Sequence, residues 1–471
     1  MKLRAKYSFG SVFSIFQFAF SVVVCLLIAN DTTIPSYYHY LWVLPIISGG
    51  GAFLISLSNP DYMEDIRYLI VSSLFFVRNS VTPLFMYLGD YAGIVTKIDR
   101  NSATKSIALM TIETIVVLSY AAYATKKYRK SDVSYSFVYS HNSNNLILLI
   151  ALGLYCTATI IANPLYMSDF VSLFSGANIR MTRIGTASTS SWYTLFVILF
   201  PITYMFFCIY IMRIINSSFR SFFKIAFNIL LIITPLFFMN NSDAFNLICS
   251  LSIALVSLYN NGISKKIFIV FVSVGVSAIV IALFKMIMEL SIEASHNSAF
   301  QNLSIGFQAY FPGVCNNAGV FNVGNSYSRF TIFLYDVYST IPFRNTIFGI
   351  TTNHSLTTVW AAENGINSQI LPCIGQLYFY FSIFGPMVEC LLIKIAYKTY
   401  KKMQSTEGAF LYLTRCICFI YFIITPVMYN YTILLSRFFI TIFPMYVFSG
   451  IVERHSGKPG ADRYATLRIM Q

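Results

Sequence analysis

Charged residues are scarce in this chain of 471 residues, since Asp, Glu, Lys and Arg make up only 11% of it and 56% is hydrophobic. A soluble domain is about one quarter charged, so an ordinary soluble enzyme, a disordered tail and a collagen-like fibre are excluded. DxD, HExxH, CxxC and Walker sequences are also missing, which leaves no evident metal site, cofactor site or ATP-driven engine. The mean hydropathy of +0.66 instead indicates a multi-span membrane protein.

Long apolar runs recur along the whole chain. A membrane-spanning helix needs ~20 mainly apolar residues. We therefore predict an all-α polytopic membrane protein with about twelve transmembrane helices. The predicted spans are 8–29, 40–58, 68–88, 104–125, 145–163, 191–211, 223–239, 243–260, 267–288, 370–393, 409–428 and 431–451.

The basic residues give these spans an orientation. With the N-terminus inside, the inner loops hold about three times as many Lys and Arg as the outer loops. Both termini are therefore expected in the cytoplasm, with the first span retained as a signal anchor. The net charge of +14 follows from these loops and does not indicate nucleic-acid binding. The predicted organisation is 1–288 for helices 1–9 with an outer loop at 164–190, 289–369 for a large outer loop between helices 9 and 10, 370–451 for helices 10–12, and 452–471 for a basic cytoplasmic tail.

Five charged side chains fall inside predicted spans in a way that calls for an explanation. Arg78 and Glu113 lie near the middle of spans three and four, where they either pair with each other or line a substrate path. Glu389 and Arg415 lie toward the inner ends of spans ten and eleven, where we expect a structural ion pair. Arg437 lies toward the outer end of span twelve, where it can face a chamber beneath the large loop.

Four further arginines lie in the predicted outer loops, namely Arg180, Arg183, Arg329 and Arg344. Guanidinium groups suit phosphate and diphosphate oxygens because they donate two parallel hydrogen bonds. The alternative is ordinary solvated surface charge. A whole cationic outer vestibule is harder to dismiss, because outer basic residues work against the orientation bias.

Two residues of the large loop are candidate general bases. His354 stands in TTNHSLTTVWAAENG, shortly before the next span, and Glu363 follows it. A histidine can accept a proton near neutral pH, although a lone loop histidine is more often inert. Cys315 and Cys373 flank the polar part of this loop and can pair, but nothing in the sequence fixes their distance.

The stretch SQILPCIGQLYFYFSIFGPMVECLL, residues 368–392, resembles the start of the span after the large periplasmic loop in bacterial oligosaccharide repeat-unit polymerases, the Wzy-type O-antigen and capsule polymerases. The matching positions include Leu371, Pro372, Gly375 and Gln376, where glutamate is common in the family. Arg437 fits the arginine that these proteins often carry in a late span. The NHSL sequence at 353–356 is similar to the His-containing segment of O-antigen ligases.

The resemblance implies a glycosyltransferase of the bacterial cytoplasmic (inner) membrane that needs neither metal nor nucleotide. It would polymerise undecaprenyl-diphosphate-linked oligosaccharides into O antigen or capsular polysaccharide, a step of lipopolysaccharide or polysaccharide biosynthesis, with a chain-length regulator as an expected partner. Fixed positive charge would assist departure of the diphosphate, from Arg437 together with Arg180, Arg183, Arg329 and Arg344. His354 is the first choice of base and Glu363 the second.

Three rival functions share parts of this pattern. A flippase for lipid-linked units would share the size and the cationic cavity, but such proteins usually lack a long outer loop. An O-antigen ligase would use the same donor with a lipid A core acceptor, as NHSL suggests. A secondary transporter is disfavoured because the chain shows no internal repeat.

Overall fold

The computed structural model describes residues 9–93, 98–128, 143–162, 191–218, 298–323, 328–343, 355–365, 370–406 and 408–454, with nine further residues between 227 and 253. Of these residues 86% are helical, and none of them forms a strand. The all-helical prediction is therefore confirmed for this part of the chain. The described residues fall into two compact units, the first drawn from 1–132, 276–401 and 418–437 and the second from 133–275, 402–417 and 438–471.

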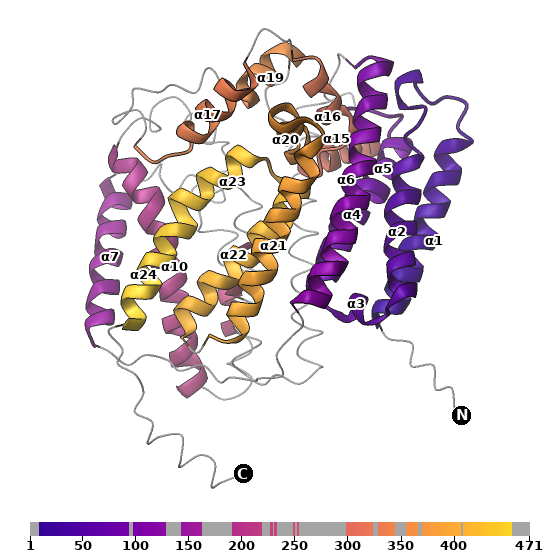
Figure 1. Ribbon diagram of the computed structural model, residues 1–471. Coiled ribbons are helices and arrows are strands. Elements are labelled where there is room, and N and C mark those ends of the chain that lie inside the picture. The colour runs from indigo at the N-terminus through magenta and orange to yellow at the C-terminus, as the bar shows by residue number, and fades with distance from the viewer. Residues whose placement is uncertain are drawn as a thin grey trace, which may run out of the picture. The chain divides into compact units, whose positions relative to one another are not determined.

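Four membrane-length helical segments stand side by side in the first unit (Figure 1). The apolar composition of these segments favours helices. Carboxylates cap two of them: Asp65 accepts a hydrogen bond from the Arg67 amide at the start of one helix, and Asp99 accepts one from the Ser102 amide at the start of another. Gly49 lets two of the helices approach closely, because a Cβ there would collide with Ser21. The elements are α1 (Phe9–Ala29), η1 (Ser36–Tyr38), α2 (Val43–Ser58), α3 (Asp61–Glu64), α4 (Ile66–Phe76), the π-helical turn η2 (Val77–Val81), α5 (Thr82–Leu88) and α6 (Arg100–Lys127).

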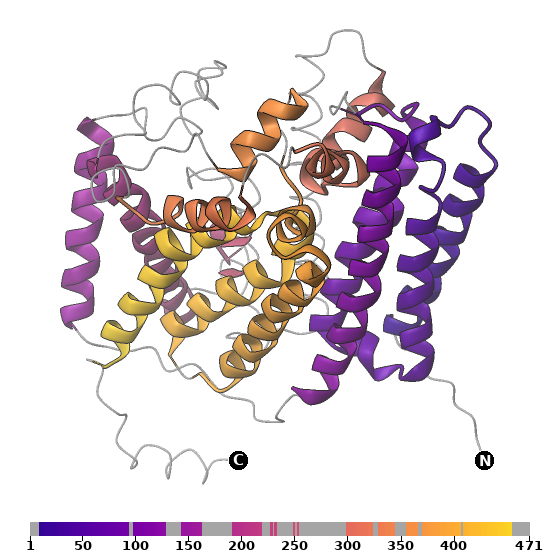
Figure 2. The ribbon, with the colours of Figure 1, turned by 45° about the horizontal axis from the view of Figure 1, so that its top comes forward.

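Helices from the segment 289–369 lie at the end of the first unit opposite α3 (Figures 1 and 2). We call them the cap helices: α15 (Ala299–Tyr310), α16 (Val314–Phe321), α17 (Arg329–Ser339) and α19 (Leu356–Asn364). Of these, α15 and α16 lie against the bundle, and α17 lies beside α20 (Cys373–Phe381) and α23 (Tyr431–Arg437). Serines open three of them, since Ser298, Ser328 and Ser355 each accept a hydrogen bond from a first-turn backbone amide. Gly365 closes α19 in the left-handed conformation with φ of 67°.

A shared apolar core holds the cap helices on the bundle. Trp360 of α19 and Val314 of α16 are buried together with Leu44 of α2 and Ile107 of α6. The Ser106 hydroxyl of α6 also donates to the Val314 carbonyl oxygen at 2.9 Å. The large loop of the sequence prediction therefore contains folded helices that pack on the spans where the structure describes it.

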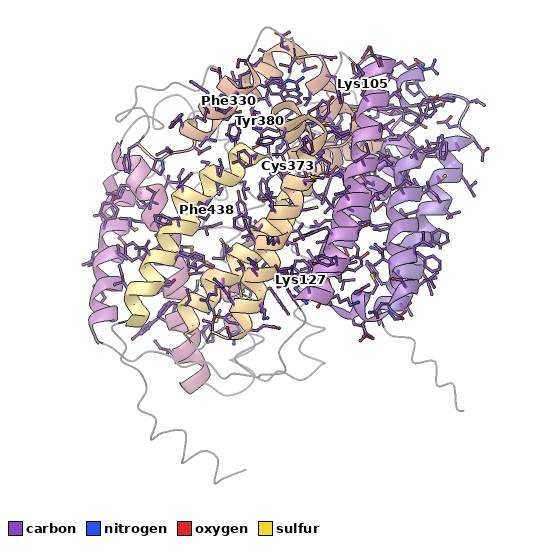
Figure 3. All side chains as sticks on the ribbon, viewed as in Figure 1. Lys105, Lys127, Phe330, Cys373, Tyr380 and Phe438 are labelled. Atoms are coloured by element: carbon purple, nitrogen blue, oxygen red, sulfur yellow. The ribbon has the colours of Figure 1, made fainter. Side chains whose placement is uncertain are left out.

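The segment after the cap helices is a broken helix. It comprises α20 (Cys373–Phe381), the short turn η5 (Ser382–Phe384) and α21 (Gly385–Gln404). Ser382 has φ of 53°, which an L-residue rarely adopts, so the helix stops there. A Cβ on Gly385 would lie 3.2 Å from the Tyr378 amide nitrogen, which shows that the chain turns tightly back on itself. Figure 3 shows Cys373 and Tyr380 along α20.

The last helices that the structure describes contribute residues to both units. They are α22 (Ala409–Met428), α23 (Tyr431–Arg437), the π-helical turn η6 (Phe438–Ile442) and α24 (Phe443–Arg454). In the second unit α10 (Ser191–Ser218) packs on α7 (Ser143–Ala162) and on α24. The hydroxyls of Thr414 and Ser449 hydrogen-bond at 2.7 Å between α22 and α24.

Eight helices of the described chain are long and apolar enough to cross a membrane. They match eight of the twelve predicted spans. A ninth prediction, 145–163, coincides with α7, whose apolar part Ile150–Ile161 is shorter than a full span. The predictions at 223–239, 243–260 and 267–288 lie almost wholly outside the described residues, as do the loop at 164–190 and the basic tail. The chain is thus a helical membrane protein, and the number twelve stays a prediction.

Candidate functional site

The face of α20 that points toward the cap helices carries a buried hydrogen-bond network. Gln376 is fully buried, and its Nε2 donates to the Tyr380 hydroxyl at 2.7 Å and to Thr432 Oγ1 at 2.5 Å. Its Oε1 accepts from the backbone amide of Tyr431 at 2.7 Å. The Tyr380 hydroxyl in turn donates to Asp336 Oδ2. We call these residues the α20 network, and it ties α17 and α20 to the first turn of α23.

Asp336 is the charged member of the α20 network. Its carboxyl has no accessible surface, and besides Tyr380 it accepts from the Leu356 amide at 3.2 Å. Burial raises the pKa of Asp336, while the hydrogen bonds from Tyr380 and from the Leu356 amide oppose that rise. The buried carboxyl of α17 lies at the first turn of α19 and holds α17 against α19 and α20, because donors from both of those helices reach its two oxygens.

Aromatic rings surround the α20 network. Phe333 of α17 lies 5.3 Å from the Tyr380 ring, 5.4 Å from the Phe381 ring and 6.2 Å from the Tyr431 ring, measured between centroids. Such edge and offset contacts favour a fixed mutual arrangement. These rings therefore pack α17 against α20 and α23 around the network.

Arg437 is the last residue of α23 and is half-buried. It lies six residues after Tyr431, about 9 Å along the helix axis from the α20 network. Its guanidinium interacts electrostatically with Tyr421, whose hydroxyl donates to the Ile433 carbonyl of α23 at 3.1 Å. The π-helical turn η6 follows directly, and such turns often occur at functional sites.

Arg78 has entirely different surroundings. Its side chain is buried, and Nη2 lies 2.6 Å from Glu113 Oε2. The Nη1 group also reaches the Pro426 carbonyl oxygen at 3.5 Å. The Arg78–Glu113 ion pair, one of the two alternatives from the sequence, is therefore present. Arg78 also lies on a π-helical turn, η2, but its guanidinium faces no accessible surface in this conformation.

The prediction of an ion pair between Glu389 and Arg415 is wrong. Glu389 lies beside Glu113, Arg78 and Cys373 in the first unit, whereas Arg415 donates to Thr406 Oγ1 and to the Lys402 carbonyl in the second. The reason is the length of α21, which runs to Gln404. Because the helix continues well beyond residue 393, Glu389 lies near the start of α21 and not near its inner end.

Two further candidates lie on the cap helices. Arg329 begins α17, is exposed, and places its guanidinium carbon 5.9 Å from the centroid of the Phe379 ring. Glu363 is exposed in the last turn of α19. Lys105 of α6 adds a cation at the same end of the bundle, 6.0 Å from the Phe321 ring (Figure 3). The cap helices and the adjoining end of α6, together called the cap layer, thus combine exposed cations with aromatic rings.

The remaining candidates, Arg180, Arg183, Arg344 and His354, lie outside the described residues. The described chain resumes at Ser355, directly after His354. Cys315 and Cys373 are both free thiols, so the disulfide between them is absent. Cys315 instead shares a hydrogen bond with the Tyr38 hydroxyl.

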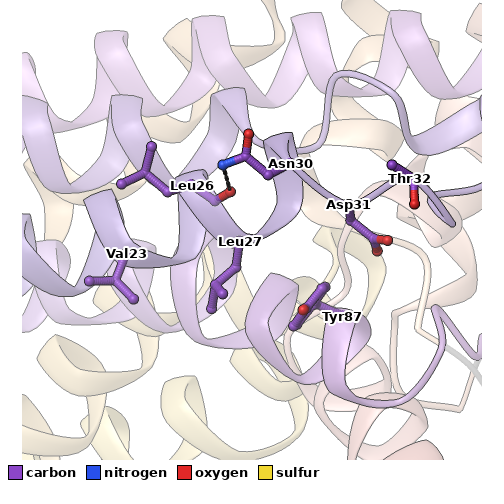
Figure 4. Close-up of a pocket in the computed structure, with 7 residues that line it drawn as sticks. All are labelled: Val23, Leu26, Leu27, Asn30, Asp31, Thr32 and Tyr87. Carbon is purple, nitrogen blue, oxygen red and sulfur yellow. Dashed lines mark hydrogen bonds between the residues drawn. The ribbon is translucent and has the colours of Figure 1, made fainter.

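A groove of about 420 Å³ with both apolar and polar lining lies elsewhere, at the end of α1 (Figure 4). Its walls are Val23, Leu26 and Leu27, with Tyr87 of α5 nearby, and its end is formed by Asn30, Asp31 and Thr32. Hydrogen bonds, first from Tyr91 and then from Thr33, lower the pKa of Asp31 and keep it ionised. The carboxylate therefore makes one end of the groove negatively charged. None of the candidate site residues lines it.

Sequence reasoning missed Asp336 as a member of the site. It is the only acidic residue in RFTIFLYDVYSTIPF, and a lone carboxylate in an apolar amphipathic segment was the signal available. Comparisons with profiles of known protein families, with curated proteins and with solved structures give no match. The site is therefore defined by its own geometry.

Proposed function

We propose that this protein is a membrane glycosyltransferase that polymerises oligosaccharide units carried on a polyprenyl diphosphate such as undecaprenyl diphosphate. The observation that carries the proposal is the folded cap layer, with exposed Arg329 and a cluster of aromatic rings, which the α20 network joins to the short helix bearing Arg437. A transporter for small solutes needs no such cover.

The reaction joins two lipid-linked substrates. The acceptor hydroxyl forms a new glycosidic bond at the anomeric carbon of the donor, the bond from that carbon to the diphosphate oxygen breaks, and polyprenyl diphosphate leaves with the electron pair. The hydroxyl proton passes to a base, with His354 preferred over Glu363. Holding both substrates at one membrane face supplies proximity.

Fixed cations assist departure of the diphosphate, because negative charge develops on its oxygens as the bond breaks. Arg437 is the first candidate, since it is half-buried and lies in a span-length segment. Arg329, Arg180, Arg183 and Arg344 complete the proposed cationic surface. Arg78 is the weakest of the candidate diphosphate ligands, because its guanidinium already forms an ion pair with Glu113.

The proposal implies the bacterial cytoplasmic (inner) membrane, with twelve spans, both termini in the cytoplasm and residues 289–369 on the outer face. It also implies an O-antigen or capsule product and, as partner, a chain-length regulator. The rival functions are a flippase and an O-antigen ligase. The cap layer favours the polymerase over the flippase, because a polymerase must bind two glycans at once and the cap layer would offer a folded surface for both.

The test is polymerisation by the purified chain in lipid vesicles, supplied with a polyprenyl-diphosphate-linked oligosaccharide and read as a ladder on a gel. The wild type should extend the units, and Arg437→Ala should lose the ladder while still inserting. Arg437→Lys is the matched control, because it keeps the charge but not the forked donors, and should retain part of the activity. Transfer of units across the vesicle membrane without any ladder would support the flippase. Transfer only to an added lipid A core would support the ligase.

A further inference from the structure

A pair of buried carboxyl groups lies inside the first unit, away from the cap layer. Glu113 of α6 and Glu389 of α21 each have 0% exposure, and Arg78 beside them has 1%. All three lie within helical segments long enough to span a membrane. Ionisable groups at such depth are costly unless their charge is balanced, and they usually mark a function.

The charges in this cluster do not balance. Arg78 forms an ion pair with Glu113 at 2.6 Å, while Glu389 has Glu113, Arg78 and the Cys373 thiol as its neighbours. Among the residues that the structure describes, Arg78 is the one cation beside Glu389, and the neighbours of this carboxyl come from η2, α6 and α20. Two ionised carboxylates would therefore leave one net negative charge enclosed in a low-dielectric interior.

The hydrogen-bond geometry also leaves three carboxyl oxygens without a partner. Within the part of the chain that the structure describes, Glu113 Oε1 and both oxygens of Glu389 are buried without a hydrogen-bond partner. Ionised carboxylates only accept hydrogen bonds, so two adjacent ones cannot satisfy each other. A proton on one of them turns that group into a donor toward the other and removes the excess charge at the same time.

We propose that Glu113 and Glu389, the acid pair, bind one exchangeable proton, which makes them a proton-binding site within the membrane bundle. This inference does not rest on the proposed glycosyl transfer. It concerns residues that have no role in that reaction, and it would hold equally for a transporter.

Polar side chains of α20 lie between the acid pair and the cap helices. Cys373, Gln376 and Tyr380 stand at i, i+3 and i+7, so they lie on one face of the helix. Cys373 lies beside Glu389, Gln376 donates to Tyr380, and Tyr380 donates to Asp336. Polar side chains therefore line α20 from the acid pair to the carboxyl of Asp336.

The test is infrared spectroscopy of the full-length protein in lipid vesicles at neutral pH, with and without D₂O. A protonated carboxylic acid has a carbonyl stretching band that ionised carboxylates lack and that shifts on deuteration. The wild type should show this band. Glu113→Gln and Glu389→Gln should each lose it entirely, because the one remaining carboxylate pairs with Arg78. Arg78→Lys, which keeps the positive charge, should retain it.

Two controls separate the acid pair from other carboxyls. Asp336 is also buried, so the band assigned to the acid pair must persist in Asp336→Asn. Labelling with ¹³C-glutamate shifts a glutamate band and leaves an aspartate band in place, which identifies the band in the wild type even where a variant fails to fold. No glutamate-derived band in the labelled wild type, or a band that survives Glu389→Gln, would overturn the proposal. In the former case both carboxylates would be ionised.

Discussion

Replacing Gln376 by leucine tests how strongly the α20 network holds the cap layer and α23 together. The side chain is fully buried and makes three short hydrogen bonds, to the Tyr380 hydroxyl, to Thr432 Oγ1 and from the Tyr431 amide. Leucine has a similar volume but can make none of them. Leaving partly buried polar groups without partners costs about 1–3 kcal/mol each. Because water can reach some of these partners, we expect a total loss of about 2–4 kcal/mol.

The matched control is Gln376→Glu. A carboxylate keeps the acceptor for the Tyr431 amide at the start of α23, where negative charge is favourable. It loses the donor to Thr432 and to Tyr380. While the new carboxyl is neutral we therefore expect Gln376→Glu to lose less than Gln376→Leu, and the loss should grow once it ionises, because it is then a buried charge beside Asp336.

The measurement is the free energy of unfolding of the purified protein in mixed micelles, followed by tryptophan fluorescence. Trp360 is fully buried in the cap layer and reports on its detachment. A Gln376→Leu protein as stable as the wild type would refute the idea that this network carries stability. Equal losses in the two variants would show that the amide donor, and not the acceptor at α23, supplies it.

Three further outcomes follow from the described residues. Burial raises the pKa of Asp336 in the folded protein above its ordinary value of 3.8. The contribution of Asp336 to folding stability is therefore complete below pH 3.8 and is lost as the pH rises through the raised pKa. Over that range the wild type should lose stability relative to Asp336→Asn, which unfolding midpoints at several pH values will show. Burial also raises the pKa of the Cys315 thiol to about 12, so a maleimide should label half-buried Cys25 first and Cys315 only on unfolding, and equal labelling rates would contradict this. The Arg67 guanidinium lies 2.5 Å from the Asp65 carboxylate and 2.6 Å from the Tyr128 carbonyl oxygen. If this ion pair acts as a buried one, Asp65→Ala should lower the free energy of unfolding by about 3–5 kcal/mol in the same assay. A loss below about 1 kcal/mol would instead class it as a surface pair.

Membrane spans could be predicted from the sequence because their signal is local. A run of apolar residues makes a helix of sufficient length whatever lies around it, and eight predicted spans coincide with helices of the structure. The ends were less certain. Span ten was predicted to end at residue 393, whereas the helix continues to Gln404 through several lysines, because long basic side chains at a helix end can extend toward water.

The α20 network could not be predicted because its members are distant in the sequence. Asp336, Tyr380 and Thr432 come from three helices, and their contact depends on the break at Ser382. Neither hydrophobic periodicity nor charge pattern encodes such a break. Gln376 was noted only as a departure from a family pattern. Its role in the structure is to join α20 to α23 by hydrogen bonds, for which an amide is suited because it both donates and accepts.

Arg78 and Arg437 show how similar sequence signals acquire different meanings. Each is an arginine in a span-length segment, and each lies at or beside a π-helical turn. Arg78 forms a fully buried ion pair with Glu113. A diphosphate could bind Arg78 only by displacing the Glu113 carboxylate, which is costly in a buried pair. Arg437 is half-buried on a helix whose first turn is fixed by Gln376. Arg437 therefore has partial exposure that the fully buried Arg78 lacks, and a cation positioned by a packed helix is what stabilisation of a leaving anion requires.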